Sequence, residues 1–409
     1  MAKAAAKGGI VIIEGGTATS PQGFRAGAVY AGIKTPGPGK LDLAIIASDH
    51  PAAVAAMFTR NTVKGAAVVV SQAHVRNGRA RAIIVNAGIS NVANGTRGQR
   101  DADEMCALAA ARLGIDADDV LVGSTGVIGR PLPMPNIRAG VPGIELTPNG
   151  GHAFARAIMT TDTQPKTMAV RFSAAGRTYT LGAVAKGVGM IHPDMATMFC
   201  FLTTDAPVER RFLKRALRAA VDDSLNMISV DGDTSTSDTA AILANGAAGG
   251  PTIDAEHPGA AAFEHALRYV CIAMAKMLAR DGEGAEKLIE VRIEGAASDR
   301  EARAAARTVT ASPLVKTAVH GNDPNWGRLM MAVGRSGARV NLARARAWLG
   351  DTMVYRGKPV PFDEAAASEA LRSEEVLLRV DLGAGHAAAT AWGCDLTPEY
   401  VHINSDYTT

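Results

Sequence analysis

A lysine, a short glycine-containing loop and a threonine lie close together near the middle of the chain. Lys186 begins the sequence Lys186-Gly-Val-Gly189, and Met195-Ala196-Thr197 follows just before the apolar run Met198-Phe-Cys-Phe-Leu202. A threonine hydroxyl is a weak nucleophile in water, because it keeps its proton far above neutral pH. An α-amine has a pKa of ~7.7–8.0 and can accept that proton, so a threonine becomes a useful nucleophile when it is the first residue of a chain.

The bond between Ala196 and Thr197 would have to break to free that amine. The Thr197 hydroxyl can attack the preceding carbonyl, move the acyl group from nitrogen to oxygen and leave an ester that water hydrolyses. The small Ala196 side chain would let its carbonyl turn toward the hydroxyl, and a rigid strand after Thr197 would hold the new terminus. The same spacing is also typical of a threonine that caps a strand, so the residues alone leave both interpretations open.

Two other features fit acyl transfer at Thr197. The sequence Gly123-Ser-Thr-Gly126 predicts a turn whose backbone N–H groups and hydroxyl could stabilise the oxyanion of a tetrahedral intermediate. Lys186 lies on the same loop as Thr197 and is the natural cation for a substrate carboxylate.

Two polar motifs invite other interpretations. The acidic loop Asp231–Asp238 suggests calcium, but an EF-hand needs Gly at its sixth position and Glu at its twelfth, where this chain has Thr236 and Ile242. We therefore expect no metal there and interpret the loop as hydrogen-bonded structure near the site. His320 precedes Asp323 in a Pro-containing turn, which could form a His–Asp pair. Since the α-amine already supplies a base, a structural role is favoured for His320.

Composition excludes several classes of protein. The chain has 409 residues, of which 47% are hydrophobic and 20% charged, and its net charge is +3. A disordered chain would be less apolar, and a dedicated nucleic-acid surface would need a stronger basic field. The 4 cysteines form no CxxC pair, and no apolar run approaches the ~20 residues of a membrane helix. We expect a cytoplasmic protein with neither nucleic acid nor membrane as a partner.

Strands and helices that could position these residues are mixed along the whole chain. Short β-branched runs between Gly, Pro, Asn or charged residues predict strands, and the continuous apolar run after Thr197 predicts a strand buried on both faces. The expected strands are Ile10–Ile13, Leu43–Ala47, Ala66–Val70, Ala82–Val85, Met168–Phe172, Thr178–Leu181, Met198–Leu202, Leu288–Ile293 and Val376–Val380. The expected helices are Ala102–Arg112, His152–Met159, Glu209–Asp223, Ala261–Arg280 and Pro361–Arg372.

Motifs along almost the entire chain resemble those of the ornithine acetyltransferase family, the bifunctional glutamate N-acetyltransferases of arginine biosynthesis. The motifs that carry the resemblance are Lys186-Gly-x-Gly-Met-Ile, Met195-Ala-Thr-Met198, Asp231-Gly-Asp-Thr-Ser-Thr236, Asp281-Gly-Glu-Gly284, His320-Gly-Asn-Asp-Pro-Asn-Trp-Gly-Arg328, Ala391-Trp-Gly-Cys-Asp395 and Asn404–Thr409. The chain departs from the usual family residues at Ile89, Val188, His192, Asp194 and Ser237.

The resemblance implies an α/β fold, a mixed α/β sandwich with sheets between helical layers. It also implies self-cleavage into an α chain, residues 1–196, and a β chain, residues 197–409, which assemble as α2β2. Thr197 would be the nucleophile, and Thr125 and Gly126 would form the oxyanion hole. The substrate-binding residues that the resemblance implies are Thr160 (or the adjacent Thr161), Lys186, Thr197, Glu283, Asn404 and Thr409.

The implied reaction is a ping-pong transfer of acetyl from N2-acetylornithine to L-glutamate, without a metal or bound organic cofactor. Acetyl-CoA as an additional donor is left open by the sequence, as is feedback inhibition by arginine. Two alternatives also stay open at this point. One is an amidase or aminopeptidase of related fold that uses water as the acceptor. The other is a non-catalytic amino-acid-binding protein, which would remain an uncut chain.

Overall fold

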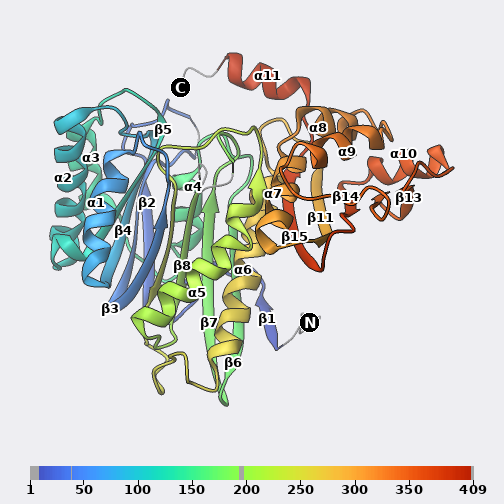
Figure 1. Ribbon diagram of the computed structural model, residues 1–409. Coiled ribbons are helices and arrows are strands. Elements are labelled where there is room, and N and C mark those ends of the chain that lie inside the picture. Colours follow the sequence, from blue (N-terminus) through green and yellow to red (C-terminus); the bar gives the residue numbers. More distant parts are fainter. Residues whose placement is uncertain (1–8, 38, 193–197, 407–409) are drawn as a thin grey trace.

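A computed structural model describes residues 9–37, 39–192 and 198–406 (Figure 1). Within these residues a nine-stranded mixed sheet has the order β1-β6-β7-β8-β10-β3-β4-β5, and β2 also pairs with β3. Its strands are β1 (Ile10–Ile13), β2 (Phe24–Val29), β3 (Leu43–Phe58), β4 (Arg79–Ile89), β5 (Val120–Val127), β6 (Lys166–Ala174), β7 (Arg177–Lys186), β8 (Phe199–Thr204) and β10 (Thr239–Ala244).

A second sheet of six strands lies beside the first, at the other end of the molecule in Figure 1. Its order is β13-β12-β14-β11-β15-β9. Its strands are β9 (Ile228–Ser229), β11 (Leu288–Ala296), β12 (Arg346–Leu349), β13 (Thr352–Arg356), β14 (Glu375–Asp381) and β15 (Ala387–Cys394).

Helices cover both faces of the larger sheet. The α-helices are α1 (Ala66–His74), α2 (Gly95–Leu113), α3 (Met134–Gly140), α4 (Gly151–Ile158), α5 (Arg210–Asp222), α6 (Ala260–Arg280), α7 (Asp299–Thr310), α8 (Pro313–His320), α9 (Trp326–Gly334), α10 (Glu364–Arg372) and α11 (Pro398–Ser405). Short 3-10 turns are η1 (Val75–Asn77), η2 (Ala117–Asp119), η3 (Val141–Gly143) and η4 (Leu225–Met227). Helix α4 packs on one face, against β2 and β3, while α1, α2, α5 and α6 cover the other. This is the expected α/β sandwich. No helix of the described residues has the length and apolar content to span a membrane.

Strand β8 confirms the prediction of a strand buried on both faces. Phe199 and Phe201 pack into the core beside α4, while Cys200 and Leu202 pack into the core beside α5 and α6. The strand lies between β7 and β10, and Lys186, at the end of β7, is paired with Phe199 at the start of β8. The two ends of the predicted cleavage loop are therefore held side by side in one sheet.

Most predicted elements are present, with shifted ends. The turn between β6 and β7 is formed by Ala175 and Gly176, whose φ angles of 49° and 78° suit a tight hairpin. The predicted helix 361–372 begins later, at Glu364, because the Asp363 carboxylate accepts the Ala366 N–H and caps it there.

Two predictions of local structure are wrong. Ala66–Val70, predicted as a strand, belongs to α1, and the Ser71 hydroxyl of this helix bonds both backbone groups of Val122 in β5. Gly123–Gly126, predicted as a turn, is part of β5 and pairs in parallel with β4. In both places tertiary packing decides the local conformation, against the β-branched content of the first segment and the glycines of the second.

Candidate active site

One pocket brings together the predicted site residues that the structure describes. It has a volume of about 160 Å³ and lies where β5, the end of β7 and the loop after α6 meet. The predicted residues that line it are Thr125, Gly126, Thr160, Lys186, Glu283 and Asn404. Thr161, the alternative to Thr160, lines it too, as do Val188 and Ser237, two of the departures from the family pattern. Ala196, Thr197, Thr409 and Asp194 lie outside the described residues.

Met198, the residue after Thr197 in the sequence, is firmly fixed. The Met198 N–H donates to Oδ1 of Asp238 over 2.8 Å, and the Met198 carbonyl accepts the Thr239 N–H. Asp238 is fully buried, which raises the pKa of its carboxyl well above the ordinary value. Met198 is therefore held by β10 directly before β8 begins.

Lys186 connects two hydroxyl groups of the pocket. Its Nζ donates to Thr160 Oγ1 over 2.8 Å and to Thr125 Oγ1 over 3.1 Å. Burial lowers the pKa of Lys186, and the negative charge of nearby Asp162 works in the opposite direction. The ammonium thus lies between the predicted oxyanion hole and the predicted substrate site, with a counter-ion of the protein's own.

Asp162 is the anion that holds this part of the site together. Its carboxylate accepts the backbone N–H groups of Thr160 and Gly187 and the Nζ of Lys166, at 3.0, 2.9 and 2.7 Å. Burial alone would raise the pKa of Asp162, but the Lys186 and Lys166 ammonium groups and these hydrogen bonds lower it to about 2. The group is ionised at neutral pH.

Lys166 extends the network to a third loop. Its buried Nζ lies 2.7 Å from Asp162 and 2.6 Å from Asp281, which in turn accepts the N–H and hydroxyl of Thr163. Asp281 begins the loop that carries Glu283. The three loops of the pocket are therefore tied together by one set of buried charges, which we call the Lys166 network (Asp162, Lys166, Asp281 and Lys186).

Glu283 lines the pocket and packs against the Lys186 loop, where its backbone N–H donates to the Val188 carbonyl. Its Oε1 accepts the Thr161 hydroxyl at 2.7 Å, and its Oε2 accepts the Asn404 side-chain amide at 2.9 Å. A Cβ atom on Gly189 would lie 2.4 Å from Glu283 Oε2, so a larger residue there would displace this carboxylate. The Lys186 loop and the Glu283 side chain are thus in close contact.

Thr125 and Gly126 lie at an edge of the large sheet. Because β5 has β4 on one side only, part of its backbone N–H groups point away from the ladder. Gly126 has φ of 125°, and a Cβ there would lie 2.2 Å from the Gly88 carbonyl carbon, so another residue would not fit. The predicted pair therefore lies on a strand edge beside Lys186, and not in a turn.

The acidic loop after β9 supports the Lys186 loop by hydrogen bonds. The Asp231 carboxylate accepts backbone N–H groups of Met190, Ile191 and Asp233. Met190 has a φ of 55°, which is uncommon outside glycine and is fixed here by these bonds. The loop therefore acts as expected, as hydrogen-bonded structure beside the site.

His320 pairs with a different acid from the one that its sequence neighbourhood suggests. Its Nδ1 lies 3.2 Å from Oδ2 of Asp395, not beside Asp323. Oδ1 of Asp395 accepts the N–H groups of Glu286 and Lys287, at 2.9 Å each. The pair thus fixes the end of the loop that carries Glu283. With Glu286 it also places three potential metal ligands within 4.8 Å.

Sequence reasoning missed Lys166, and did not assign roles to Asp162 and Asp281. Asp281 begins the motif Asp281–Gly284, and Asp162 directly follows the predicted residues Thr160 and Thr161. Lys166 gives no signal, because a lysine at the start of a strand is ordinarily solvated. Only its burial between Asp162, four residues earlier in the chain, and Asp281, on another loop, reveals its part.

Comparison with known proteins identifies relatives across the whole chain. The profile of the ArgJ family matches residues 25–409. The arginine biosynthesis bifunctional protein ArgJ of Symbiobacterium thermophilum is 52% identical over 400 residues, which cover 96% of this chain and 99% of the relative. The protein of the same name from Thermus thermophilus is 48% identical over 390 residues, covering 95% and 99%.

Among solved structures, ornithine acetyltransferase from Mycobacterium tuberculosis complexed with ornithine is 39% identical. The match covers 45% of this chain and 98% of that one, with a TM-score of 0.42. An ArgJ protein from Bacillus halodurans is 43% identical, covering 51% and 98%, with a TM-score of 0.49.

Proposed function

The chain belongs to the ArgJ family of arginine biosynthesis, and we propose that it carries acetyl on Thr197 between N2-acetylornithine and L-glutamate. It is an acyltransferase. Its relatives are named bifunctional proteins, and we assign both acetylornithine and acetyl-CoA as donors. The enzyme would work in the cytoplasm as α2β2, formed from residues 1–196 and 197–409, without a bound cofactor.

Maturation would begin with Thr197. Its Oγ attacks the Ala196 carbonyl carbon, the peptide C–N bond breaks, and the nitrogen takes the hydroxyl proton. Water then hydrolyses the ester, which leaves an Ala196 carboxylate and a free Thr197 α-amine. That amine is the base for the acetyl-transfer steps.

The first transfer releases ornithine. The Oγ of Thr197 attacks the acetyl carbonyl carbon of acetylornithine, and its proton passes to the α-amine. Backbone donors at Thr125 and Gly126 stabilise the oxyanion. The C–N bond then breaks, the proton goes to the leaving nitrogen, and an acetyl ester remains on Thr197.

The second transfer is the reverse with another amine. The neutral amine of glutamate attacks the ester carbonyl, the C–Oγ bond breaks, and the surplus amine proton returns to Thr197 through its α-amine. N-acetylglutamate leaves, and the enzyme is regenerated.

The observation that best supports this proposal is the pair of opposite charges at the pocket. Lys186 suits a substrate carboxylate, and Glu283 suits an ammonium group such as that at the end of the ornithine side chain. Glu283 is already oriented by Thr161 and Asn404, which limits the reorganisation needed on binding. An α-amino acid with a distal amine could pair its carboxylate with Lys186 and its ammonium group with Glu283.

The test is the release of ornithine from acetylornithine by the purified enzyme, with and without glutamate. The proposal expects one turnover per site without glutamate and continuous release with it, together with an equal amount of N-acetylglutamate. Continuous release of ornithine and acetate without glutamate would instead establish an amidase that uses water.

A further inference from the structure

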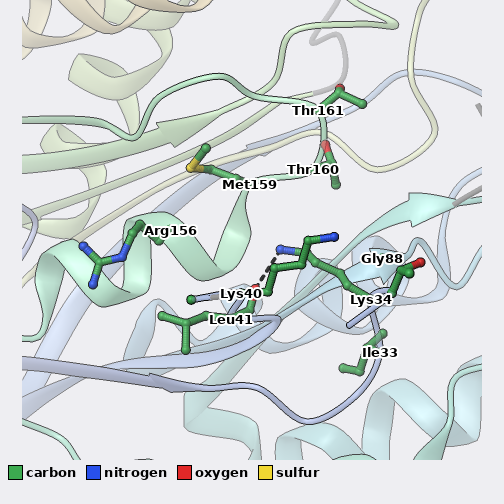
Figure 2. Close-up of a pocket in the computed structure, with 11 residues that line it drawn as sticks. Ile33, Lys34, Lys40, Leu41, Gly88, Arg156, Met159, Thr160 and Thr161 are labelled. Atoms are coloured by element: carbon green, nitrogen blue, oxygen red, sulfur yellow. Dashed lines mark hydrogen bonds between the residues drawn. The ribbon is translucent and has the colours of Figure 1, made fainter. Parts of the chain in front are cut away.

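A second pocket adjoins the candidate active site. It has a volume of about 270 Å³, and Thr160 and Thr161 line both pockets. The rest of its wall comes mainly from the segment before β3 and from the end of α4. In Figure 2, Thr160 and Thr161 lie toward one end, Arg156 toward the other, and Lys34 and Lys40 between them. We call it the basic pocket.

The charged side chains that line it are all positive. Lys34, Lys40 and Arg156 line it, and its described lining residues include no acid. Within the described parts of the chain, neither the Lys40 nor the Arg156 side chain has a hydrogen bond or ion pair, and both residues are exposed. Two such exposed cations beside a third in one pocket attract an anionic ligand.

Lys34 lies deeper in the pocket and is fixed by the backbone. Its Nζ donates to the carbonyls of Leu41 and Ala157, at 2.8 and 3.1 Å, which leaves one of its three N–H groups for a ligand. Burial lowers the pKa of Lys34 to about 8, so the group is still mostly charged at neutral pH.

The wall between these charges is apolar. Ile33, Leu41 and Met159 contribute most of it, and in Figure 2 Leu41 and Met159 lie on the side of the two lysines toward Arg156. A ligand that fits both features has a long uncharged part and a group with more than one negative charge.

We propose that the basic pocket holds the phosphate-bearing part of an acyl-thioester donor, whose acyl end reaches the candidate active site past Thr160 and Thr161. The inference rests on the proposed function and assigns residues to one of its donors. Acetylornithine and glutamate are short, and their charges lie within a few bonds of the reacting nitrogen, where Lys186 and Glu283 are available. A thioester donor carries its phosphates far from the acyl carbon, so these need cations at a distance from Thr197.

The step that this donor supplies balances without another reactant. The Oγ of Thr197 attacks the thioester carbonyl, a C–O bond forms and the C–S bond breaks. The hydroxyl proton passes through the Thr197 α-amine to the leaving thiolate, and the free thiol departs. Glutamate then takes the acetyl group as before.

The test compares three donors with glutamate as the acceptor. Acetyl-CoA has the phosphates, S-acetyl-N-acetylcysteamine is a thioester without them, and acetylornithine is the amide donor. In the variant Lys40→Glu/Arg156→Glu, we expect the KM for acetyl-CoA to rise at least ~10-fold, the scale of one lost charge-assisted contact. The kinetics with the other two donors should be unchanged. Inorganic pyrophosphate should compete with acetyl-CoA and not with acetylornithine.

Lys358→Glu is the matched control, since Lys358 is an exposed lysine just after β13, in the smaller sheet's part of the chain. It should leave the kinetics with all three donors unchanged. The proposal is overturned if the double variant keeps its KM for acetyl-CoA, or if it loses activity equally with every donor. It is also overturned if the wild-type enzyme transfers acetyl from acetylornithine but neither uses acetyl-CoA nor binds CoA in calorimetry. Loss of transfer from acetylornithine in the wild type would contradict the proposed function instead.

Discussion

The candidate active site and the basic pocket share a wall, yet the charged side chains are paired with one another in the first and largely unpaired in the second. In the first, Lys186, Lys166 and Asp162 compensate one another, and Glu283 is held by Thr161 and Asn404. In the second, Lys40 and Arg156 have no ionic partner among the described residues. A site whose charges are already paired is preorganised for chemistry. Exposed cations without a partner are instead suited to bind an anionic ligand.

This difference predicts the largest effect for Lys166, on stability. Lys166→Met leaves Asp162 and Asp281 buried without their shared cation. Removing one partner of a buried ion pair costs ~3–5 kcal/mol, so we expect a loss of that size in the free energy of unfolding. Urea unfolding measures it. Lys40→Met, from the basic pocket, is the matched control and should change this free energy little. Equal effects of the two variants would remove the distinction between the two regions.

Lys186 comes next, with its effect on catalysis. Lys186→Met keeps the length of the side chain and removes the ammonium that contacts Thr125 and Thr160. We expect kcat/KM for acetylornithine to fall ~10- to 100-fold, which corresponds to the loss of a charge-assisted contact. Steady-state kinetics with acetylornithine and glutamate measure this. An unchanged kcat/KM would exclude Lys186 from the site.

Glu283 tests the other charge of the pocket. Glu283→Gln keeps the shape but loses the negative charge, and one of its two neighbouring donors, Thr161 or Asn404, loses its acceptor. The KM for acetylornithine should rise ~10-fold, because its ammonium loses a charged partner. The KM for glutamate, which has no such ammonium, should change less. A larger rise in the KM for glutamate than in the KM for acetylornithine would show that Glu283 does not bind the ornithine side chain.

The smallest predicted effect is a shift in pH dependence. Lys186 is charged below its pKa, so carboxylate binding fails as the pH rises through that pKa. Asp162 raises this pKa, against burial. Asp162→Asn should therefore move the alkaline fall of kcat/KM to lower pH.

Asp281→Asn is the control for that measurement. It alters the same network, but Asp281 is not among the charges that shift the pKa of Lys186. Its alkaline limb should match that of the wild type. If the alkaline fall of kcat/KM in Asp162→Asn stays at the wild-type pH, Asp162 does not raise the pKa of Lys186.

The fold could be predicted from the sequence where the pattern of apolar residues alone determines which side chains are buried. Phe199–Leu202 is apolar at every position, and the structure buries it on both faces. The prediction failed for Ala66–Val70, whose valines favour a strand but whose buried residues Ala67, Val68, Val70 and Ser71 fit one helix face against β5. Such a segment is decided by its neighbours in space.

The site could be predicted only as far as motifs mark it. The resemblance selected Thr125, Thr160, Lys186 and Glu283, and the structure places them in one pocket. It gave no sign that Lys166 joins Asp162 to Asp281. Asp281 lies 115 residues after Lys166 in the chain. The basic pocket was missed for the same reason, since Lys34 and Arg156 come together only through the contact between α4 and the segment before β3.

The central claim, that the hydroxyl of Thr197 cuts the chain and then carries acetyl, is tested most directly by intact mass spectrometry of the purified protein. We predict two fragments that sum to the 42.3 kDa chain plus one water, and a single uncut chain for Thr197→Ala. Incubation with acetylornithine should add one acetyl group, 42 Da by its formula, to the fragment that begins at Thr197. A fully active enzyme that consists only of the uncut 42.3 kDa chain would contradict the account.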